Sequence, residues 1–333
     1  MSKMGHYRDS FVNRSAGFDV RGTIDGLRDS LDQSVQASAR IEERLQAFRN
    51  ETAETLAESV AELAAVRRRL ETQLAATRQE RDAIPELTAR LAALRATPDY
   101  RKSWSEREPL VSVRIASYLK TEELVDVAIA SVLAQTYDNF ELIVVNDGPN
   151  DTTRRAVEGI GDPRISYSEL PQRGEYPEDP HWRWMVAGSP AMNHAAGLAT
   201  GVWIAPLDDD DEFTPDHLEK LVSIGVENEV ELSYGALTQK HLVHGWEKRI
   251  WSSPPAISEF SFQGAIYLRA LHDIFRYDER SWIVEEPGDW NLIRRMKEAG
   301  VTMACTTDVV AVMNMVPYTL KGDTALADAT PEH

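Results

Sequence analysis

A run of four aspartates and a glutamate is the strongest chemical signal in this chain, in the segment APLDDDDEFTP at residues 205–215. Neighbouring carboxylates repel one another unless they are protonated or a cation neutralises them, and hard divalent cations prefer carboxylate oxygens. The run therefore predicts a magnesium or manganese site. Asp208 and Asp210 are the expected ligands, because alternate positions of an extended segment point to the same side.

Two other interpretations of the acidic run are open at this point. One is a solvated acidic loop, although such a run rarely follows a buried strand directly. The other is a calcium site, although calcium loops space their ligands and include an early Gly, which this run lacks.

The acidic run follows a series of predicted strands and helices. Apolar or helically spaced stretches predict strands at 110–118, 140–147 and 201–207 and helices at 121–135 and 188–199. A further helix is expected directly after the run, with Thr214 as its N-cap and Pro215 in its first position. Strands joined by helices through short connections favour a parallel α/β sheet, in which ligands bind at the carboxyl ends of strands.

Two single aspartates occupy comparable positions. Asp147 ends the apolar stretch FELIVVND and precedes a turn, although Asp before Gly is also ordinary turn chemistry. Asp289, in EEPGDWNLIRRM, stands between a turn and a predicted helix. There it either presents a carboxylate into a cleft or serves as a plain helix N-cap. Glu285 and Glu286 precede it and are alternative acid–base groups.

Residues 24–97 predict a coiled coil. Apolar side chains recur at three- and four-residue steps, and one series has a period of seven: Leu56, Leu63, Leu70, Thr77, Ile84 and Leu91. A helix of this length must pack on another helix, so a homo-oligomer or a protein partner is expected. Because Pro85 removes a backbone donor, a helical hairpin and a straight oligomeric coil are both open.

The expected organisation has five parts. They are a flexible N-terminal extension at 1–23, the coiled coil at 24–97, a linker at 98–109, an α/β domain at 110–316 and a C-terminal tail at 317–333. Charge divides the chain in the same way. Residues 1–108 contain 18 Lys and Arg and 18 Asp and Glu, which leaves 18 basic and 36 acidic residues in 109–333.

This acidic half excludes nucleic acid as a partner, because nucleic-acid binding depends on a basic surface. A phosphorylated ligand would need a metal cation as intermediary. No apolar stretch of about 18 residues and no secretory signal stand out, and Cys305 is the single cysteine. A cytoplasmic protein is expected, with no transmembrane segment, that reaches the inner face of the membrane only through partners.

Four motifs in order resemble the family 2 glycosyltransferases with the GT-A fold: VSVRIASY, SVLAQTYDNFELIVVNDG, NHAAGLATGVWIAPLDDDDEFTPDHLE and EEPGDWNLIRRMKEAG. The resemblance covers about residues 109–315 and leaves the coiled coil outside. It implies a Rossmann-like, mostly parallel sheet flanked by helices. It also implies a metal-dependent, inverting hexosyltransferase that uses a nucleotide-sugar donor, in surface polysaccharide or glycoconjugate synthesis.

The resemblance implies roles for individual residues. Asp147 would accept a hydrogen bond from a pyrimidine base, and Ala116 and Tyr118 would line the base pocket. Asp210 would ligate Mn²⁺ or Mg²⁺ directly, while Asp208 would lie nearer the ribose or a metal-bound water. A carboxylate that accepts from a ring N–H favours UDP and leaves dTDP and GDP open.

Asp289 matches the catalytic base of the family. An acceptor hydroxyl must lose its proton as it attacks, which requires a carboxylate on the opposite face of the sugar, and attack from that face inverts the anomeric centre. Glu286, Trp290, Asn193 and Arg183 are expected to contact the acceptor or to support the site. Of these, the Trp290 ring could pack on the apolar face of a sugar.

Three departures from the family pattern stand out. Met192 replaces an Arg found in many relatives, so diphosphate contacts are expected from Arg183 or Arg173. Asn314 stands where many relatives have a metal-binding His. The insert RGEYPEDPHWRWMVAG is long and rich in Trp.

Two function classes follow from the sequence. The first is the glycosyltransferase, with the coiled coil as its means of assembly. The alternative is a catalytically weak scaffold that binds a nucleotide sugar and works through its coiled coil. A nucleotidyltransferase is disfavoured, because the chain lacks a Gly-rich phosphate loop of the usual spacing.

Overall fold

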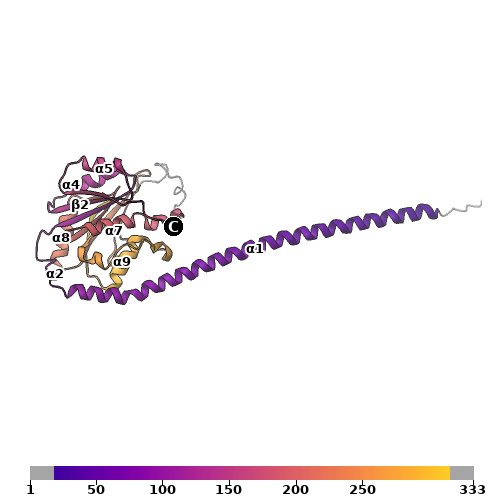
Figure 1. Cartoon of the computed structure of the whole chain (residues 1–333), viewed down its shortest axis with the longest axis horizontal. Coiled ribbons are helices and arrows are strands. Elements are labelled where there is room, and N and C mark those ends of the chain that lie inside the picture. Colours follow the sequence, from indigo (N-terminus) through magenta and orange to yellow (C-terminus); the bar gives the residue numbers. More distant parts are fainter. Residues whose placement is uncertain (1–18, 316–333) are drawn as a thin grey trace, which may run out of the picture. The chain divides into compact units, whose positions relative to one another are not determined.

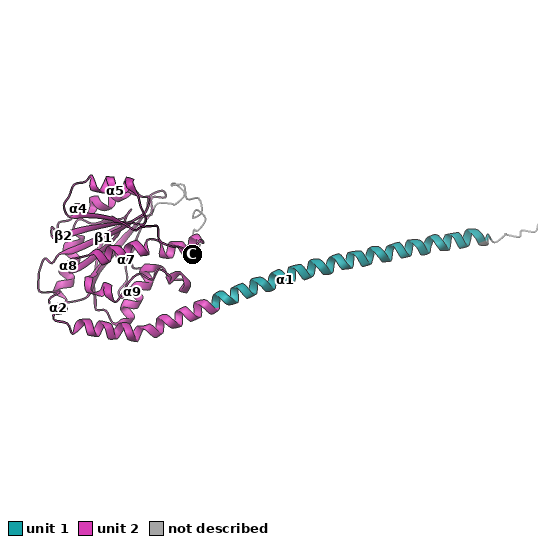
Figure 2. Cartoon of the chain, viewed as in Figure 1, with its two compact units in different colours: residues 1–70 teal, residues 71–333 magenta. Residues whose placement is uncertain are grey.

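The computed structural model describes residues 19–315 of the chain. It divides into two compact units, residues 1–70 and residues 71–333 (Figure 2). Most of the expected N-terminal extension and all of the expected tail at 317–333 therefore lie outside the described residues.

The described part of the first unit is one helix, α1 (Val20–Arg95), as far as Leu70. The helix begins before the expected start at residue 24. It is continuous through Pro85, so the expected alternative of a helical hairpin is wrong. Its large apolar side chains up to Leu70 are exposed: Ile24, Leu27, Leu31, Val35, Ile41, Leu45, Phe48, Leu56, Val60, Leu63, Val66 and Leu70.

The second unit is built on a sheet flanked by helices (Figure 1). The sheet has nine strands in the order β3-β2-β1-β4-β8-β6-β9-β5, and β7 pairs with β6. The strands are β1 (Val111–Ser117), β2 (Phe140–Asn146), β3 (Ile165–Glu169), β4 (Trp203–Asp208), β5 (Glu212–Phe213), β6 (Leu232–His241), β7 (Glu247–Ile250), β8 (Ala265–Leu268) and β9 (Met303–Met315). Strands β3, β2, β1 and β4 are parallel, whereas β8 is antiparallel to both β4 and β6. Strands β1, β2 and β4 are almost wholly buried, as their continuous apolar runs require.

Helices cover this sheet. They are α2 (Pro98–Arg101), α3 (Thr121–Glu123), α4 (Ala130–Leu133), α5 (Asp151–Glu158), α6 (Pro180–Val186), α7 (Ser189–Leu198), α8 (His217–Glu227) and α9 (Gly288–Ala299). A π-helical turn, η1 (Leu124–Ile129), joins α3 to α4, and short 3-10 turns are η2 (Phe262–Gly264), η3 (Arg269–Asp273) and η4 (Ser281–Val284). Helix α7 packs on β1 and β2, α8 on β6, and α5 on β3. The expected mixed α/β fold is confirmed.

The helix after the acidic run begins later than expected. Helix α8 begins at His217, so Thr214 is not its N-cap. The chain first forms β5, in which Glu212 pairs with Val312 of β9. Instead, Thr214 Oγ1 donates a hydrogen bond to Asp216 Oδ1 at 2.9 Å. Pairing with β9 keeps the chain extended, which delays the helix.

The last turns of α1 are part of the second unit. Leu91, in the series with a period of seven, is fully buried in the core, and Leu87 and Leu94 pack against that core. Tyr100 and Trp104, in the segment expected as a linker, pack there too. This stretch of apolar residues therefore packs within the chain's own globular unit.

The buried carboxylate of Glu231 joins the end of α1 to the sheet through hydrogen bonds. Glu231 is fully buried and accepts hydrogen bonds from Arg95 Nε (2.8 Å), Arg95 Nη2 (2.6 Å), Tyr100 Oη (2.6 Å) and Thr302 N (2.7 Å). Burial alone would raise the pKa of Glu231. These hydrogen bonds lower it by more than burial raises it, so the pKa lies below its ordinary value. Within residues 19–315, no helix is both long and apolar enough to span a membrane.

We expect Glu231→Gln to lower the free energy of unfolding by about 2 kcal/mol, because it removes a buried charge that accepts hydrogen bonds from the partly exposed Arg95 guanidinium. Urea unfolding at pH 7 measures this. Since the folded pKa of Glu231 is depressed, its contribution is present above its unfolded pKa of about 4.3 and is lost as pH falls through the lower folded value. Glu106→Gln, at an exposed position, is the control, and equal stability of the two variants would contradict this role.

Candidate active site

Three parallel strands end at one edge of the sheet. Ser117 of β1 lies opposite Asn146 of β2, and Ala116 lies opposite Asp208 of β4. Asp147 directly follows β2, and Asp208 is the last residue of β4. Both aspartates therefore lie at the carboxyl edge of the parallel strands, where the strand pattern predicts a ligand site.

A lysine neutralises part of the acidic run. Lys120 Nζ lies 2.6 Å from Asp210 Oδ2 and 3.3 Å from Asp209 Oδ1. Asp209 Oδ2 also accepts a hydrogen bond from Tyr118 N at 3.2 Å. Asp209 is 7% exposed, so this segment is not a solvated loop.

The strand β9 reaches the same place from the end of the sheet. Asn314 N donates to Asp211 Oδ1 at 2.7 Å, and Asn314 Nδ2 donates to the main-chain oxygen of Asp210 at 3.1 Å. Asn314, which stands where many family members have a His, therefore contacts the acidic run. Its side-chain amide is occupied by a backbone carbonyl.

Burial and repulsion together disfavour the ionised form of three carboxyls in this run. Burial, followed by the charge of Asp289, raises the pKa of Asp208 to about 7. Burial raises the pKa of Asp209 although Lys120 opposes it, and burial with the charge of Asp208 raises the pKa of Asp211 well above its ordinary value. Without a further cation, the run therefore cannot hold all of its carboxyls ionised at low cost.

The donor set suits a hard divalent cation in chemistry but is not a complete cage. Asp208 and Asp210 are both partly exposed and offer carboxylate oxygens, the ligands that Mg²⁺ and Mn²⁺ prefer. Among residues 19–315, however, no group of three or more His, Cys, Asp or Glu is arranged to hold a metal ion. A cation here would need further ligands, such as diphosphate oxygens.

Asp147 is held by the Trp-rich insert. Its Oδ1 accepts from Gly174 N at 2.8 Å and its Oδ2 from Tyr176 Oη at 2.6 Å. The guanidinium of Arg173 lies 4.0 Å from the centre of the Tyr118 ring and 5.4 Å from that of Tyr176. The insert therefore contacts the ends of β1 and β2 through Asp147 and Tyr118.

Asp289, at the start of α9, faces the sheet and accepts three hydrogen bonds. Tyr277 Oη donates to its Oδ1 at 2.9 Å, while Ser261 Oγ at 2.6 Å and Phe262 N at 3.1 Å donate to its Oδ2. Tyr277 Oη itself accepts from Arg114 Nη2 at 2.9 Å. Asp289 does not cap its own helix, so the plain N-cap interpretation is wrong.

A short chain of polar groups joins Asp289 to the acidic run. Gln263 Nε2 donates to Asp208 Oδ2, and Gln263 Oε1 contacts Ser261 Oγ, which bonds to Asp289. The two carboxylates come from segments that are distant in sequence. The fold therefore brings Asp208 and Asp289 to one site.

Arg114 is a buried cation beneath this site. It is 1% exposed, and within the described part of the chain neither its Nε nor its Nη1 has a hydrogen-bond partner. Although burial lowers its pKa, the neighbouring tyrosines and the charges of Asp208 and Asp289 raise it, so the pKa lies above its ordinary value. Arg114 therefore offsets negative charge from below.

Asn193 lies beside the site, whereas Arg183 is hydrogen-bonded within the insert. Asn193 donates to Tyr277 O (3.0 Å) and accepts from Tyr277 N (2.9 Å), so it supports the tyrosine that contacts Asp289. Arg183 donates to the carbonyls of Pro177 and Glu178 within the insert. The expectation that Arg183 contacts a diphosphate has no support in this geometry, which leaves Arg173 as the nearer candidate.

Glu286 and Trp290 flank Asp289 but make different contacts. Glu286 is bound by Arg294, with Nε at 2.8 Å from its Oε1 and Nη2 at 2.7 Å from its Oε2. Trp290 packs partly against the core, and Lys297 Nζ lies 5.3 Å from the centre of its ring. Glu286 is therefore committed to an ion pair, and its role as an acid–base group is disfavoured.

Five residues of this site were not expected from the sequence. They are Arg114, Lys120, Ser261, Gln263 and Tyr277. An arginine within the apolar strand segment VSVRIASY was a usable signal, because a buried guanidinium requires partners. The other four stand in segments without a pattern, and only the tertiary contacts place them here.

We expect Asp147→Asn to speed hydrogen exchange at the Gly174 amide by about ten- to a hundredfold, because the hydrogen bond to a charged acceptor is lost. Mass-spectrometric exchange over the insert measures this. Asp151→Asn, at an exposed position in the first turn of α5, is the matched control. Equal exchange in both variants would show that Asp147 does not hold the insert.

Comparison with known proteins relates the part of the chain that carries Asp147 and the acidic run to a family. The model of "Glycosyl transferase family 2" matches residues 112–177 and 181–275. The UDP-Glc:alpha-D-GlcNAc-diphosphoundecaprenol beta-1,3-glucosyltransferase WfgD of Escherichia coli is 36% identical over 126 residues, which are 38% of this chain and 45% of that protein. The succinoglycan biosynthesis protein ExoO of Rhizobium meliloti is 34% identical over 117 residues, 35% of this chain and 30% of that protein.

A third relative, the putative colanic acid biosynthesis glycosyl transferase WcaA of Escherichia coli, is 32% identical over 115 residues, 34% of this chain and 37% of that protein. The solved structure of S. aureus TarS aligns with 62% of this chain and 37% of that chain, at a TM-score of 0.46 and 17% identity, which is too distant to bear on function. The chain thus spans less than half the length of the curated relatives described here. Its second unit, through residues 112–275, belongs to glycosyl transferase family 2.

Proposed function

We propose that this protein is a metal-dependent, inverting glycosyltransferase that moves a sugar from a nucleoside-diphosphate sugar to an acceptor hydroxyl. One observation supports this above all others. In a member of glycosyl transferase family 2, Asp208 and Asp289 meet at the carboxyl edge of the sheet through Gln263 and Ser261. The arrangement brings Asp208, a carboxylate assigned to the diphosphate and its cation, together with Asp289, the candidate base.

Asp208 and Asp210 are the residues that would hold Mn²⁺ or Mg²⁺. When bound, the cation would neutralise the charge that develops on the diphosphate leaving group. The crowding of the carboxyls at residues 208–211 beside Lys120 favours this assignment, because a divalent cation would neutralise carboxylates that repel one another. Lys120 supplies one positive charge from the protein.

The donor base is assigned to the pocket beside Asp147, with Ala116 and Tyr118. A carboxylate there accepts a hydrogen bond from a ring N–H, as uracil offers. UDP is the favoured nucleotide, and the relative WfgD is named for a UDP-glucose donor. Arg173, whose guanidinium lies 4.0 Å from the centre of the Tyr118 ring, would meet the negative charge of the nucleotide.

Asp289 is assigned as the base that takes the proton of the acceptor hydroxyl. Tyr277, Ser261 and the Phe262 amide orient its two oxygens. Attack on the face opposite the leaving diphosphate inverts the anomeric centre. The relatives named for colanic acid, succinoglycan and diphosphoundecaprenol-linked substrates favour a polysaccharide or glycoconjugate acceptor, met at the cytoplasmic membrane surface through partners.

We expect the full chain with Mn²⁺ to release nucleoside diphosphate from a nucleotide sugar, and EDTA to abolish release. Asp289→Asn should lower kcat by about 10²- to 10⁴-fold while donor affinity stays within about threefold of wild type, because the base acts on the acceptor. A coupled assay gives kcat, and calorimetry gives donor binding.

The exposed variant Asp273→Asn is the control for this experiment. Loss of donor binding in Asp289→Asn would reassign that residue to a structural role. Donor binding without any release by the wild type, across donors and acceptors, would favour the nucleotide-sugar-binding scaffold instead.

The first unit is assigned to self-association. Its row of exposed apolar side chains, at three- and four-residue steps, suits the seam of a coiled coil with a second copy of the helix. We expect the full chain to sediment as an oligomer and the double variant Leu56→Glu with Leu63→Glu to sediment as a monomer, because charges in the seam oppose pairing.

Analytical ultracentrifugation measures this, with Glu54→Gln and Glu58→Gln as exposed controls on the same turns. A wild-type chain that stays monomeric at all accessible concentrations would refute self-association.

A further inference from the structure

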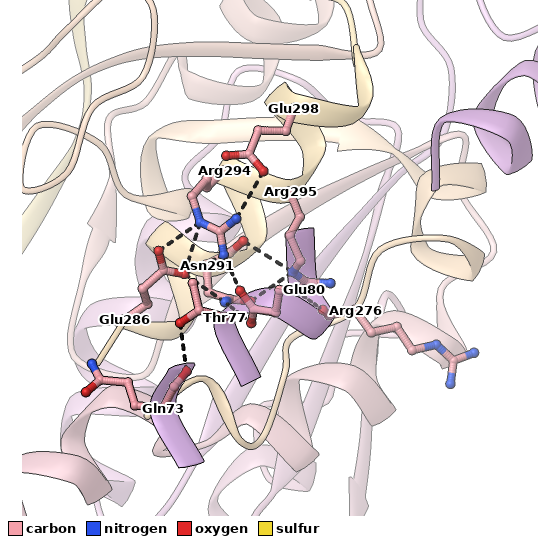
Figure 3. A network of polar contacts seen from close by, with 9 residues as sticks. All are labelled: Gln73, Thr77, Glu80, Arg276, Glu286, Asn291, Arg294, Arg295 and Glu298. Atoms are coloured by element: carbon pink, nitrogen blue, oxygen red, sulfur yellow. Dashed lines mark hydrogen bonds and ion pairs between the residues drawn. The ribbon is translucent and has the colours of Figure 1, made fainter. Parts of the chain in front are cut away.

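The helix α9 carries Asp289 in its first turn. Two other residues of this helix, Asn291 and Arg294, contact Glu80 of α1 (Figure 3). The contact lies within the second unit, where Glu80 of α1 reaches two residues of α9. Glu80 Oε1 accepts from Asn291 Nδ2 at 2.9 Å, and Glu80 Oε2 accepts from Arg294 Nη2 at 2.5 Å. One carboxylate thus binds two successive turns of the helix.

The same two residues of α9 also bind Glu286. Asn291 Nδ2 donates to Glu286 Oε2 at 2.9 Å, and Arg294 is bidentate to Glu286. Glu80 and Glu286 therefore share one guanidinium and one amide. Asn291 is fully buried, and the side chains of Glu80 and Arg294 are only 15% and 17% exposed, so solvent screens this network little.

These contacts bracket Asp289 in the sequence. Glu286 precedes it by three residues, and Asn291 follows it by two. The N-terminus of α9 has no side-chain cap, so its first turn depends on other contacts. A cavity of about 280 Å³, lined in part by Glu80, Val284 and Glu286, lies beside this loop, which limits the support that packing gives it.

The network also extends toward the partner of Asp289. Asn291 Oδ1 accepts from Arg295 Nε at 2.8 Å, and Arg295 Nη2 donates to the carbonyl of Arg276 at 2.6 Å. Arg276 directly precedes Tyr277, whose hydroxyl donates to Asp289. Asn291 is thus linked to Glu286, which precedes Asp289, and through Arg295 to the segment before Tyr277. Glu80 binds this same Asn291.

We infer that Glu80 is a positioning residue for Asp289, and that the last turns of α1 are a working part of the active site. This inference rests on the proposed function of Asp289 as the base. Glu80 does not touch substrate. It fixes where the first turn of α9 presents the carboxylate, and small displacements of a reacting group cost much of the rate.

The test compares Glu80→Gln with Glu86→Gln in the full chain, since Glu86 is an exposed carboxylate on the same helix. We expect Glu80→Gln to lower kcat about tenfold or more while the donor KM changes less than about twofold, because the donor-binding aspartates are not part of the network. Hydrogen exchange over residues 286–292 should become faster in Glu80→Gln and stay unchanged in Glu86→Gln. Thermal melting checks that both variants fold.

Exchange and turnover separate the two ideas. Unchanged exchange at 286–292 together with unchanged kcat would overturn the positioning role, and so would an effect on donor KM alone. If the wild type shows no turnover at all, the proposed function fails, and faster exchange in Glu80→Gln still supports the structural link between Glu80 and α9. Should Glu80→Gln not fold, Glu80→Asp keeps the charge, shortens its reach, and is expected to lower kcat in the same direction.

Discussion

Crowding of carboxylates at one sheet edge is the constraint on which this site depends. Asp209 and Asp211 are buried and Asp208 is partly exposed, and Asp289 lies close enough that its charge, after burial, raises the pKa of Asp208. Such a group is costly in a folded protein unless positive charge accompanies it. The side chains of the protein supply only part of this positive charge.

Two basic side chains supply positive charge to the carboxylates from different directions. Lys120 contacts the run directly, and Arg114 lies buried behind Tyr277. The remaining imbalance is the physical reason that the proposed function pairs a divalent cation with a diphosphate at this site. An acidic surface alone would repel a nucleotide sugar, whereas a surface that first binds a cation attracts it.

The long helix has two different physical environments. Up to Leu70 its apolar row faces solvent, which suits assembly with another helix. Beyond that point its side chains are used within the globular unit, where Leu91 joins the core, Arg95 pairs with Glu231, and Glu80 holds α9. A single regular pattern in sequence thus serves both association and the support of the site.

The sequence by itself determined the fold class, the long helix and the positions of the key aspartates, because these follow from local periodicity and from residues that end apolar strands. The helix start predicted from the sequence after the acidic run was wrong, because the pairing of Glu212 with Val312 is a contact between distant segments. Only the tertiary structure decided which groups surround Asp289, that Asn193 supports its partner Tyr277, and that Arg183 and Glu286 are engaged elsewhere. Hydrogen bonds such as Glu80 to Arg294 join residues more than two hundred positions apart, and no local pattern encodes such a distance.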